Sequence, residues 1–178
     1  MKILIFIPHM GLGGVERSFI NLSKEFKNKG HNVKFVSLND IKSTYNEDLK
    51  FIKLNSKRTV FSINKLSKTF NDEGPDLIIS AQYYANIIAV ISSKFSKNKA
   101  KIIISERNHL SSELKKLNLF KRLIISSLIK FLYKKADLIY GNSDEVCNDL
   151  KKNFNLKNKI KKILNASFIE NINKLSKE

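Results

Sequence analysis

The N-terminal stretch constrains the fold of this chain more than any other. Residues Ile3–Ile7 form a continuous apolar run, which is typical of a strand buried on both faces of a parallel sheet. Pro8 ends the run, and three glycines follow within Gly11–Gly14. From Val15, apolar residues recur at spacings of three and four, which predicts a helix. The stretch therefore predicts a βα unit joined by a glycine turn.

A glycine turn that leads into a helix N-terminus is a candidate anion site. Glycine permits positive φ angles and close approach of the backbone to a ligand, and we expect both at Gly11, Gly13 and Gly14. The unpaired N–H groups and the helix dipole then attract negative charge. The pattern favours a phosphate or diphosphate ligand, and the alternative is a turn that only joins the strand to the helix.

Two common nucleotide-binding motifs fit this turn poorly. The dinucleotide fingerprint G-x-G-x-x-G matches at Gly11 and Gly13, but Glu16 replaces the third glycine, which normally permits close packing of helix on strand. A P-loop is excluded because no Gly-Lys-Ser/Thr follows. A nicotinamide-dependent oxidoreductase domain remains an alternative, with Asp40 as the acidic residue after the second strand.

Composition narrows the class of protein. The 178 residues are 42% hydrophobic, enough for one globular α/β domain. The single cysteine, Cys147, excludes an internal disulfide and suits a reducing cytoplasm. No signal peptide, spanning apolar run, Cys/His cluster or Asp-x-Asp motif is present in the sequence. We therefore expect a cytoplasmic protein that needs no metal.

The formal net charge of +17 points to an anionic partner. Lysine greatly outnumbers arginine, and no nucleic-acid motif is present, so no nucleic acid is expected as a partner. A non-enzymatic module that binds anionic lipid or nucleic acid remains a second alternative.

Strands and helices alternate along the predicted chain. Strands are expected at 3–7, 33–38, 51–54, 77–80, 101–105, 137–140 and 160–164, and helices at 15–29, 59–70, 82–95, 120–135 and 144–153, with a start at Ser112 as an alternative for the fourth helix. This alternation predicts an α/β fold with a doubly wound parallel sheet, which is Rossmann-like. Polar clusters follow three of the strands, at Pro8–Gly14, Glu106–His109 and Gly141–Ser143. Carboxyl ends of parallel strands share one edge, so we expect these clusters to form one site.

The same segments, in the same order, resemble glycosyltransferase family 4, a family of retaining enzymes. Gly13-Gly14-Val15-Glu16-Arg17 is similar to its Gly-Gly-Ala-Glu-Arg segment, and later landmarks match at Pro75–Ile78, Ile104–Glu106, Ala136–Ser143 and 163–165. The resemblance implies one half of a GT-B fold, in which two Rossmann-like domains enclose a cleft. We expect the N-terminal, acceptor-binding domain at residues 1–165 and an interdomain hinge at 166–178. The donor-binding C-terminal domain is expected to be absent, so this chain alone should need that domain or a partner subunit.

The resemblance also implies the function and its residues. The activity would be transfer of a sugar from a nucleotide sugar, itself a substrate and not a cofactor, to a glycan or lipid-linked acceptor of the bacterial cell envelope. Gly13 and Gly14 would meet the donor diphosphate. Arg107 stands where many members carry a histidine near the transferred sugar, and it is a candidate catalytic residue together with His109. The candidate acceptor or sugar contacts are His9, Glu16, Arg17, Glu106, Asn142 and Ser143.

A basic helix supplies a further hypothesis. At about 100° per residue, one side carries Lys115, Lys116, Arg122, Lys130 and Lys134, with Leu119, Leu123 and Tyr133 among them. The side expected to face the core carries Ile124, Leu128, Phe131 and Leu132. Basic residues mixed with exposed apolar ones favour peripheral attachment to an anionic leaflet on the inner face of the membrane. The alternative is a solvated charged face.

Overall fold

A parallel sheet forms the centre of the computed structural model, which describes residues 1–11, 13–38, 49–156 and 160–164. Within these residues the sheet has seven strands in the order β3-β2-β1-β4-β5-β6-β7, and every adjacent pair is parallel. The strands are β1 (Lys2–Phe6), β2 (Asn32–Ser37), β3 (Lys50–Lys53), β4 (Leu77–Ala81), β5 (Lys101–Glu106), β6 (Leu138–Gly141) and β7 (Ile160–Lys162). The predicted α/β fold with a doubly wound parallel sheet is confirmed.

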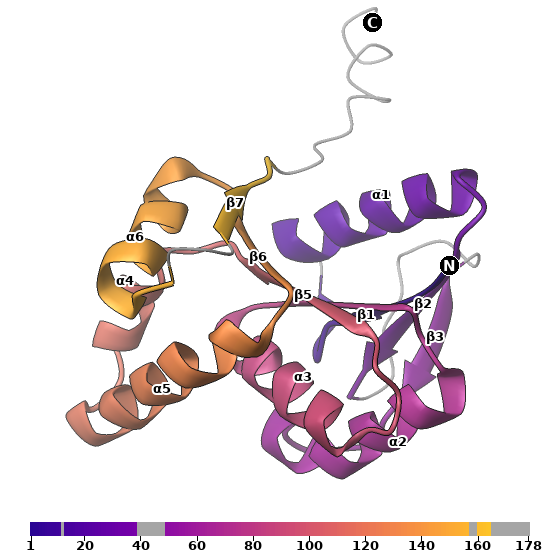
Figure 1. Ribbon diagram of the computed structural model, residues 1–178, viewed down its shortest axis with the longest axis horizontal. Coiled ribbons are helices and arrows are strands. Elements are labelled where there is room, and N and C mark those ends of the chain that lie inside the picture. The colour runs from indigo at the N-terminus through magenta and orange to yellow at the C-terminus, as the bar shows by residue number, and fades with distance from the viewer. Residues whose placement is uncertain (12, 39–48, 157–159, 165–178) are drawn as a thin grey trace, which may run out of the picture.

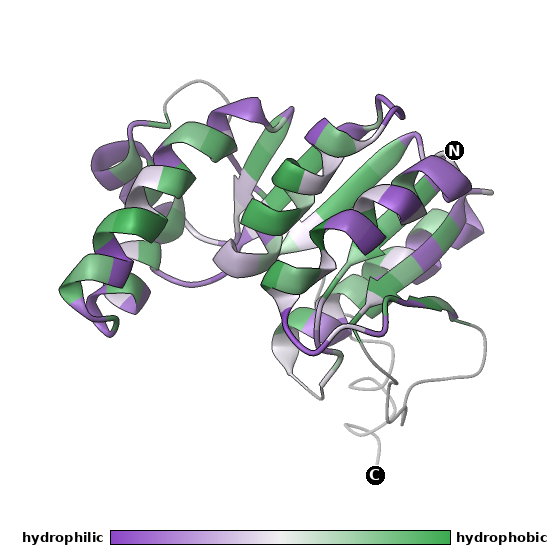
Figure 2. Cartoon of the chain, turned by 90° about the horizontal axis from the view of Figure 1, so that it is seen from below, coloured by the Kyte–Doolittle hydropathy of each residue, from purple (hydrophilic) through white to green (hydrophobic). Residues whose placement is uncertain are grey.

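Helices cover both faces of the sheet (Figure 1). They are α1 (Gly14–Asn28), α2 (Ile63–Glu73), α3 (Tyr83–Phe95), α4 (Leu110–Lys115), α5 (Leu119–Leu132) and α6 (Asp144–Phe154), with short 3₁₀ helices η1 (Thr59–Ser62) and η2 (Tyr133–Lys135). Helix α1 packs on one face, while α2, α3 and α5 pack on the other. Figure 2 shows the strands as a hydrophobic layer between helices of mixed hydropathy.

Strand β1 shows why a continuous apolar run is needed. Ile3 and Ile5 pack with Phe19 of α1, whereas Leu4 and Phe6 point to the opposite cluster beneath α2 and α3. All four strand residues are at most 2% exposed. Burying each such side chain stabilises the fold by about 1.5–3 kcal/mol, so both layers depend on this strand.

The strand order reverses beside β1. The chain runs outward from β1 to β3 and then returns to place β4 on the other side of β1. In open α/β sheets, ligands bind outside the carboxyl ends of strands at such a switch point. The segments that follow β1 and β4 therefore border the expected site.

Two predicted helices differ from the structure. The helix expected at 59–70 begins as the 3₁₀ helix η1, in which Val60 is exposed. The helix expected at 120–135 is preceded by the separate α4, because Asn118 caps α5: its Oδ1 accepts a hydrogen bond from the N–H of Lys121 at 2.9 Å. Asp40, the boundary at residue 165 and the hinge at 166–178 lie outside the described residues.

Candidate active site

The glycine turn enters α1 in an extended conformation. Gly13 is the N-cap residue with φ −76° and ψ 169°, and the positive-φ glycines among the described residues are Gly30 and Gly74. The expectation of positive φ at Gly11, Gly13 and Gly14 is therefore wrong. An N-cap residue normally has an extended backbone conformation. The turn therefore does not require a glycine in the left-handed conformation at Gly13.

The glycines of this turn instead allow the carboxylate of Glu16 to lie close to the backbone. A Cβ on Gly13 would lie 2.5 Å from Oε2 of Glu16, and one on Gly11 would lie 3.9 Å from Oε1 of the same carboxylate. The carboxylate thus lies over the turn at the N-terminus of α1, where the helix dipole favours negative charge. A Cβ on Gly14 would meet nothing within 4 Å, so this part of the turn is open.

Arg107 ties the end of β5 to α1 and β6. Its Nε donates to Oγ of Ser105 at 3.0 Å, and Nη1 and Nη2 each donate to Oγ of Ser18 at 3.2 Å. Nη2 also lies 3.4 Å from the hydroxyl of Tyr140. The guanidinium carbon is 5.0 Å from the ring centroid of Phe19 and 5.7 Å from that of Tyr140, within the range of cation–π attraction. A fixed positive charge therefore lies one helical turn beyond the glycine turn.

Glu106 is the centre of a buried polar network. Its Oε1 accepts hydrogen bonds from Nδ2 of Asn86, at 2.8 Å, and from the hydroxyl of Tyr133. Nδ2 of Asn86 also donates a hydrogen bond to the carbonyl oxygen of Ser105 at 2.9 Å. Oδ1 of Asn86 accepts a hydrogen bond from the hydroxyl of Ser80 at 2.7 Å. Burial raises the pKa of Glu106 to about 8 against the opposing effect of these hydrogen bonds. The carboxyl is therefore mostly protonated at neutral pH.

A pocket of about 320 Å³ opens beside this network. Its walls come from the β4–α3 junction, the end of β5 and helix α4 with the residues after it: Gln82, Tyr83, Tyr84, Glu106, Arg107, Asn108, Glu113, Lys116 and Leu117. The sequence predicted Glu106 and Arg107 as site residues but missed the three residues at the β4–α3 junction. These three residues come just after the predicted strand 77–80. Their position at the carboxyl end of a strand could have identified them as candidate site residues.

His109 faces a different part of the molecule. It is the N-cap residue of α4, and its Nδ1 lies 3.5 Å from Oδ2 of Asp149 on α6 and close to the hydroxyls of Ser111 and Ser112. Burial acts to raise the pKa of Asp149, but hydrogen bonds from Ser111 and Asn153 outweigh it and hold that pKa below its usual value. The structure therefore gives Arg107 and His109 different neighbours.

The remaining predicted contacts lie along the same edge. His9 and Arg17 are exposed beside the glycine turn. Ser143, predicted as a contact, is the N-cap residue of α6 and accepts a hydrogen bond from the N–H of Val146 at 3.3 Å. Oδ1 of Asn142 is buried and has no hydrogen-bond partner among the residues that the structure describes. Such an acceptor is costly when unpaired, which is consistent with a ligand contact.

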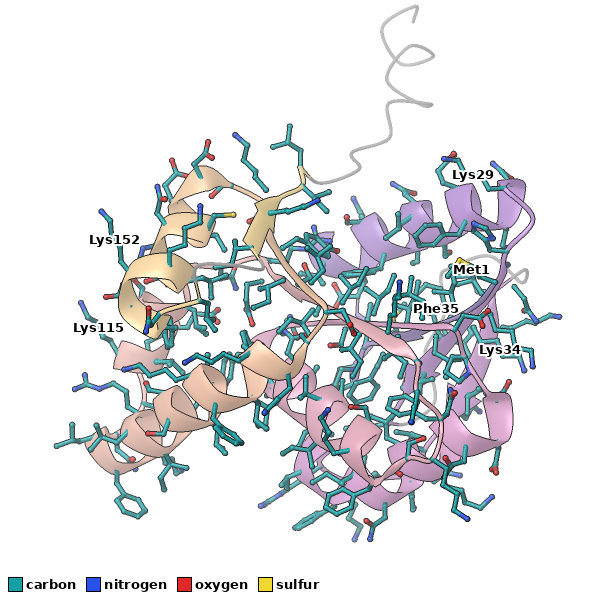
Figure 3. All side chains as sticks on the ribbon, viewed as in Figure 1. Met1, Lys29, Lys34, Phe35, Lys115 and Lys152 are labelled. Carbon is teal, nitrogen blue, oxygen red and sulfur yellow. The ribbon has the colours of Figure 1, made fainter. Side chains whose placement is uncertain are left out.

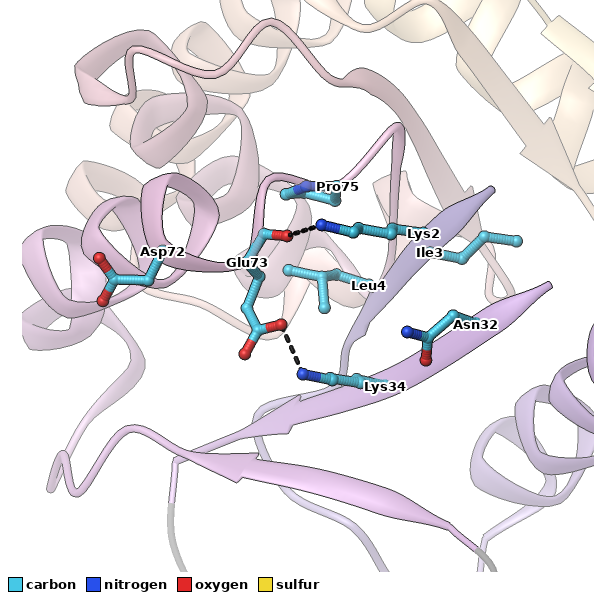
Figure 4. A pocket seen from close by; sticks show the side chains of 8 residues that line it. All are labelled: Lys2, Ile3, Leu4, Asn32, Lys34, Asp72, Glu73 and Pro75. Atoms are coloured by element: carbon cyan, nitrogen blue, oxygen red, sulfur yellow. Dashed lines mark hydrogen bonds and ion pairs between the residues drawn. The ribbon is translucent and has the colours of Figure 1, made fainter.

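A second pocket lies at the opposite edge of the sheet, near the amino ends of β1 and β2 (Figure 4). It measures about 250 Å³. Nζ of Lys34 lies 2.6 Å from a carboxylate oxygen of Glu73, and Nζ of Lys2 donates to the Glu73 carbonyl at 3.3 Å. These charges satisfy one another and connect α2 to the sheet, so we assign this pocket a structural role.

Helix α5 presents an apolar face to solvent, contrary to part of the prediction. Ile124, Leu128 and Phe131 are exposed, and only Leu132 of the predicted core side packs against the core. Tyr133, expected among the basic residues, is fully buried. The helix is apolar on several sides, and the core takes Ile125, Ile129 and Leu132. Leu119 and Leu123 are exposed as predicted.

Basic residues border this apolar face. Lys115, Lys116, Lys130 and Lys134 are exposed, and Arg122 is half-buried. Leu123, Ile124, Ser127, Leu128 and Phe131 line a shallow groove on α5. Lys115 on α4 and Lys152 on α6 point outward on the same side of the molecule (Figure 3). In the part of the chain that the structure describes, no helix has the length and apolar character needed to cross a membrane.

Comparison with known proteins defines the class. The family model of Glycosyltransferase Family 4 matches residues 12–166, and the chain belongs to this family. A Campylobacter jejuni protein, N-acetylgalactosamine-N,N'-diacetylbacillosaminyl-diphospho-undecaprenol 4-alpha-N-acetylgalactosaminyltransferase, is 33% identical over 188 aligned residues. The match covers 96% of this chain and 49% of that protein, so the chain spans about half the length of this curated relative.

Solved structures share the fold. The lipopolysaccharide outer core galactosyltransferase WaaB matches with a TM-score of 0.71 and 19% identity, over 96% of this chain and 47% of that one. Anabaena HepE in complex with UDP matches with a TM-score of 0.71 and 18% identity, over 99% and 49%. The chain therefore has the fold of one half of a GT-B glycosyltransferase, as the sequence predicted. The family match favours this class over the oxidoreductase and binding-module alternatives.

Proposed function

We propose that the chain is the acceptor-side half of a glycosyltransferase that moves a sugar from a nucleotide sugar to a glycan or lipid-linked acceptor of the cell envelope. The observation that carries the proposal is the convergence of the open glycine turn and the fixed Arg107 guanidinium at the β1/β4 switch point. The names of the relatives agree with it: one acts on a diphospho-undecaprenol-linked sugar, and another was solved with UDP.

The donor diphosphate would bind where the helix dipole and Arg107 both supply positive potential. Backbone N–H groups of Gly13 and Gly14 would donate to the phosphate oxygens, and the Glu16 side chain would rotate away from the turn. The guanidinium would stabilise charge on the leaving diphosphate. This chemistry consists of positioning and charge stabilisation, so the chain's part needs no metal or cofactor of its own.

The acceptor would lie along the same edge of the sheet. His9, Arg17 and Asn142 would contact it, a role supported by their position after the carboxyl ends of β1 and β6. His109 would contribute from the N-terminus of α4, where its Nδ1 lies 3.5 Å from Oδ2 of Asp149. The donor domain, supplied by further chain or by a partner subunit, would complete the cleft.

Helix α5 would attach the protein to the cytoplasmic face of an anionic membrane. Its exposed leucine, isoleucine and phenylalanine side chains would enter the interface, and bordering lysines would each add about 1 kcal/mol near anionic lipid. Peripheral attachment there would bring the acceptor edge close to lipid-linked substrates.

Sedimentation with vesicles tests the membrane contact. Wild-type protein should sediment with vesicles that contain phosphatidylglycerol, and a variant with Lys115→Glu, Lys116→Glu, Lys130→Glu and Lys134→Glu should stay in the supernatant. The control is Lys24→Glu on α1 together with Lys29→Glu at its C-cap, on the opposite face of the sheet from α5. Equal sedimentation of the α5 variant and the wild type would contradict the membrane assignment.

A further inference from the structure

We propose that Asp149 is a positioning residue, whose buried carboxylate keeps a proton on Nδ1 of His109 and so leaves Nε2 to accept a hydrogen bond from a substrate hydroxyl. The inference rests on the proposed function, in which His109 contributes to the reaction. It deepens that function by naming the group that orients the imidazole and sets its tautomer. Asp149 lies on α6, far from His109 in sequence, and the sequence analysis did not single it out.

The contact between α4 and α6 holds a carboxylate among apolar side chains. Helix α4 packs against α6 (Figure 1), and the side chain of Asp149 is fully buried. Leu110 and Leu114 of α4 and Leu150 of α6 all belong to the hydrophobic core. An ionised carboxylate is costly in such surroundings unless donors satisfy it, and an aliphatic side chain would avoid that cost. The carboxylate therefore indicates a polar task at this contact.

Donors from both helices satisfy the two carboxylate oxygens. Oδ2 of Asp149 accepts a hydrogen bond from the N–H of Ser111 at 2.9 Å. Oδ1 accepts one from Nδ2 of Asn153 at 2.6 Å. These bonds fix the orientation of the carboxyl group, because each oxygen has its own partner. Oδ2 is held on the side of α4, where it lies 3.5 Å from Nδ1 of His109.

The neighbours of Nδ1 determine which nitrogen of His109 carries the proton. Besides Asp149, the hydroxyl oxygens of Ser111 and Ser112 lie 3.2 Å and 3.1 Å from Nδ1. A carboxylate only accepts hydrogen bonds, whereas a serine hydroxyl can accept or donate. A protonated Nδ1 therefore suits all three neighbours, and an unprotonated one would place a lone pair against the carboxylate. A buried carboxylate beside Nδ1 holds a histidine in this tautomer.

The opposite nitrogen is the one that a substrate can use. The His109 side chain is 47% exposed, and within the described residues the contacts of its imidazole are made by Nδ1. With the proton on Nδ1, a neutral ring has its lone pair on Nε2. His109 follows the carboxyl end of β5, so Nε2 can accept from a hydroxyl at the edge of the site. Asp149 is buried and acts only through the imidazole.

Long-range ¹H–¹⁵N NMR of the full chain, labelled at its three histidines, tests the proposal. The ¹⁵N shifts of a neutral imidazole identify its protonated nitrogen, and His109→Gln assigns the resonance. At alkaline pH we expect the Nδ1–H tautomer of His109 in the wild type. Asp149→Ala should move the proton to Nε2, because the neighbouring serine hydroxyls can then donate to Nδ1. The matched control is Asp144→Ala, an exposed carboxylate of the same helix that pairs with Lys162, which should leave the tautomer unchanged.

Kinetics distinguish positioning from a purely structural effect. In the transferase assembled with its donor-binding domain, Asp149→Ala should raise the acceptor KM about tenfold, as expected for one lost hydrogen bond, and leave the donor KM unchanged. In a His109→Ala background, Asp149→Ala should have no further effect, because a positioning residue acts only through the group that it positions. Additive losses in the double variant would instead indicate that Asp149 only stabilises α4.

Three results would overturn the proposal: an Nε2–H tautomer of His109 in the wild type, an unchanged tautomer in Asp149→Ala, or additive losses in the double variant. If Asp149→Ala fails to fold, the wild-type tautomer decides. The NMR measurement needs no turnover, so its outcome is separate from that of the proposed function. An active transferase whose acceptor KM is unchanged in Asp149→Ala would reject the positioning role and leave the glycosyltransferase assignment intact.

Discussion

The hydroxyl of Tyr133 donates a hydrogen bond to the carboxyl of Glu106 inside the core, across 27 positions of sequence. This contact joins η2, at the end of α5, to the carboxyl end of β5. Tyr133 is fully buried and Glu106 is 2% exposed, so the pair links the α5 layer to the floor of the candidate site.

The buried carboxyl should make stability depend on pH. Glu106 has a folded-state pKa of about 8, above its ordinary value of 4.5, so the folded state binds its proton more tightly than the unfolded state does. Its stabilising contribution is full below about pH 4.5 and is lost as pH rises through 8, with a slope of about 1.4 kcal/mol per pH unit. Denaturant unfolding between pH 5 and 8 should therefore show stability falling in the wild type and a shallower slope in Glu106→Gln. Equal slopes in the two proteins would refute this account of Glu106.

Gly141 should tolerate no side chain. A Cβ there would lie 2.9 Å from Sγ of Cys147 and 2.9 Å from Cγ1 of Val146, because the first turn of α6 packs directly on β6. We expect Gly141→Ala to lower the free energy of unfolding by about 1–3 kcal/mol. The matched control is Gly14→Ala, which has open space around its Cβ and should change stability by less than about 0.5 kcal/mol. Two equally stable variants would show that α6 packs less closely than described.

Two neighbouring residues of α5 should respond differently to truncation. Ile129 is fully buried and Phe131 is 65% exposed. Ile129→Ala should cost about 2–5 kcal/mol by leaving a cavity, whereas Phe131→Ala should cost no more than about 0.5 kcal/mol. Thermal or denaturant unfolding of the purified variants measures both. A larger loss in Phe131→Ala would restore the helix orientation first expected from the sequence.

Arg107 should require its guanidinium and not only its charge. Lysine keeps the charge but cannot contact Ser18 and Ser105 together or stack between Phe19 and Tyr140 in the same way. In the transferase assembled with its donor-binding domain we expect Arg107→Lys to lower kcat at least tenfold, and Arg107→Ala about a hundredfold. A steady-state transferase assay measures both, with Lys29→Ala as the control. Unchanged kcat in Arg107→Ala would remove this residue from the proposed chemistry.

The sheet was predictable because its signal is local and unambiguous. The short run Ile3–Ile7, ended by Pro8, is typical of a strand buried on both faces, and Gly74 and Pro75 directly precede the strand expected at 77–80. Alternation of such strands with helices leaves few topologies besides a doubly wound sheet. The polar clusters at the carboxyl ends followed from that topology alone, before any contact was known.

Side-chain direction was less predictable. Helix α5 has apolar residues on more than one side, so periodicity does not distinguish Ile129, which is buried, from Phe131, which is exposed. The different neighbours of Arg107 and His109 depend on Ser18 and Asp149, which lie far away in sequence. The sequence analysis missed Tyr83 and Tyr84 as pocket residues, because the pattern around them predicts only the apolar start of a helix.

Transfer of a labelled sugar by this chain together with its donor-binding domain, on the same polypeptide or on a partner subunit, tests the central claim most directly. The protein would be incubated with radiolabelled UDP-sugars and a bacterial polyprenyl-diphosphate-linked glycan fraction. We predict that label from at least one UDP-sugar moves into the organic phase with the wild type, and that this transfer falls about a hundredfold in Arg107→Ala. The absence of transfer from every donor, or turnover of a nicotinamide cofactor instead, would contradict the glycosyltransferase assignment.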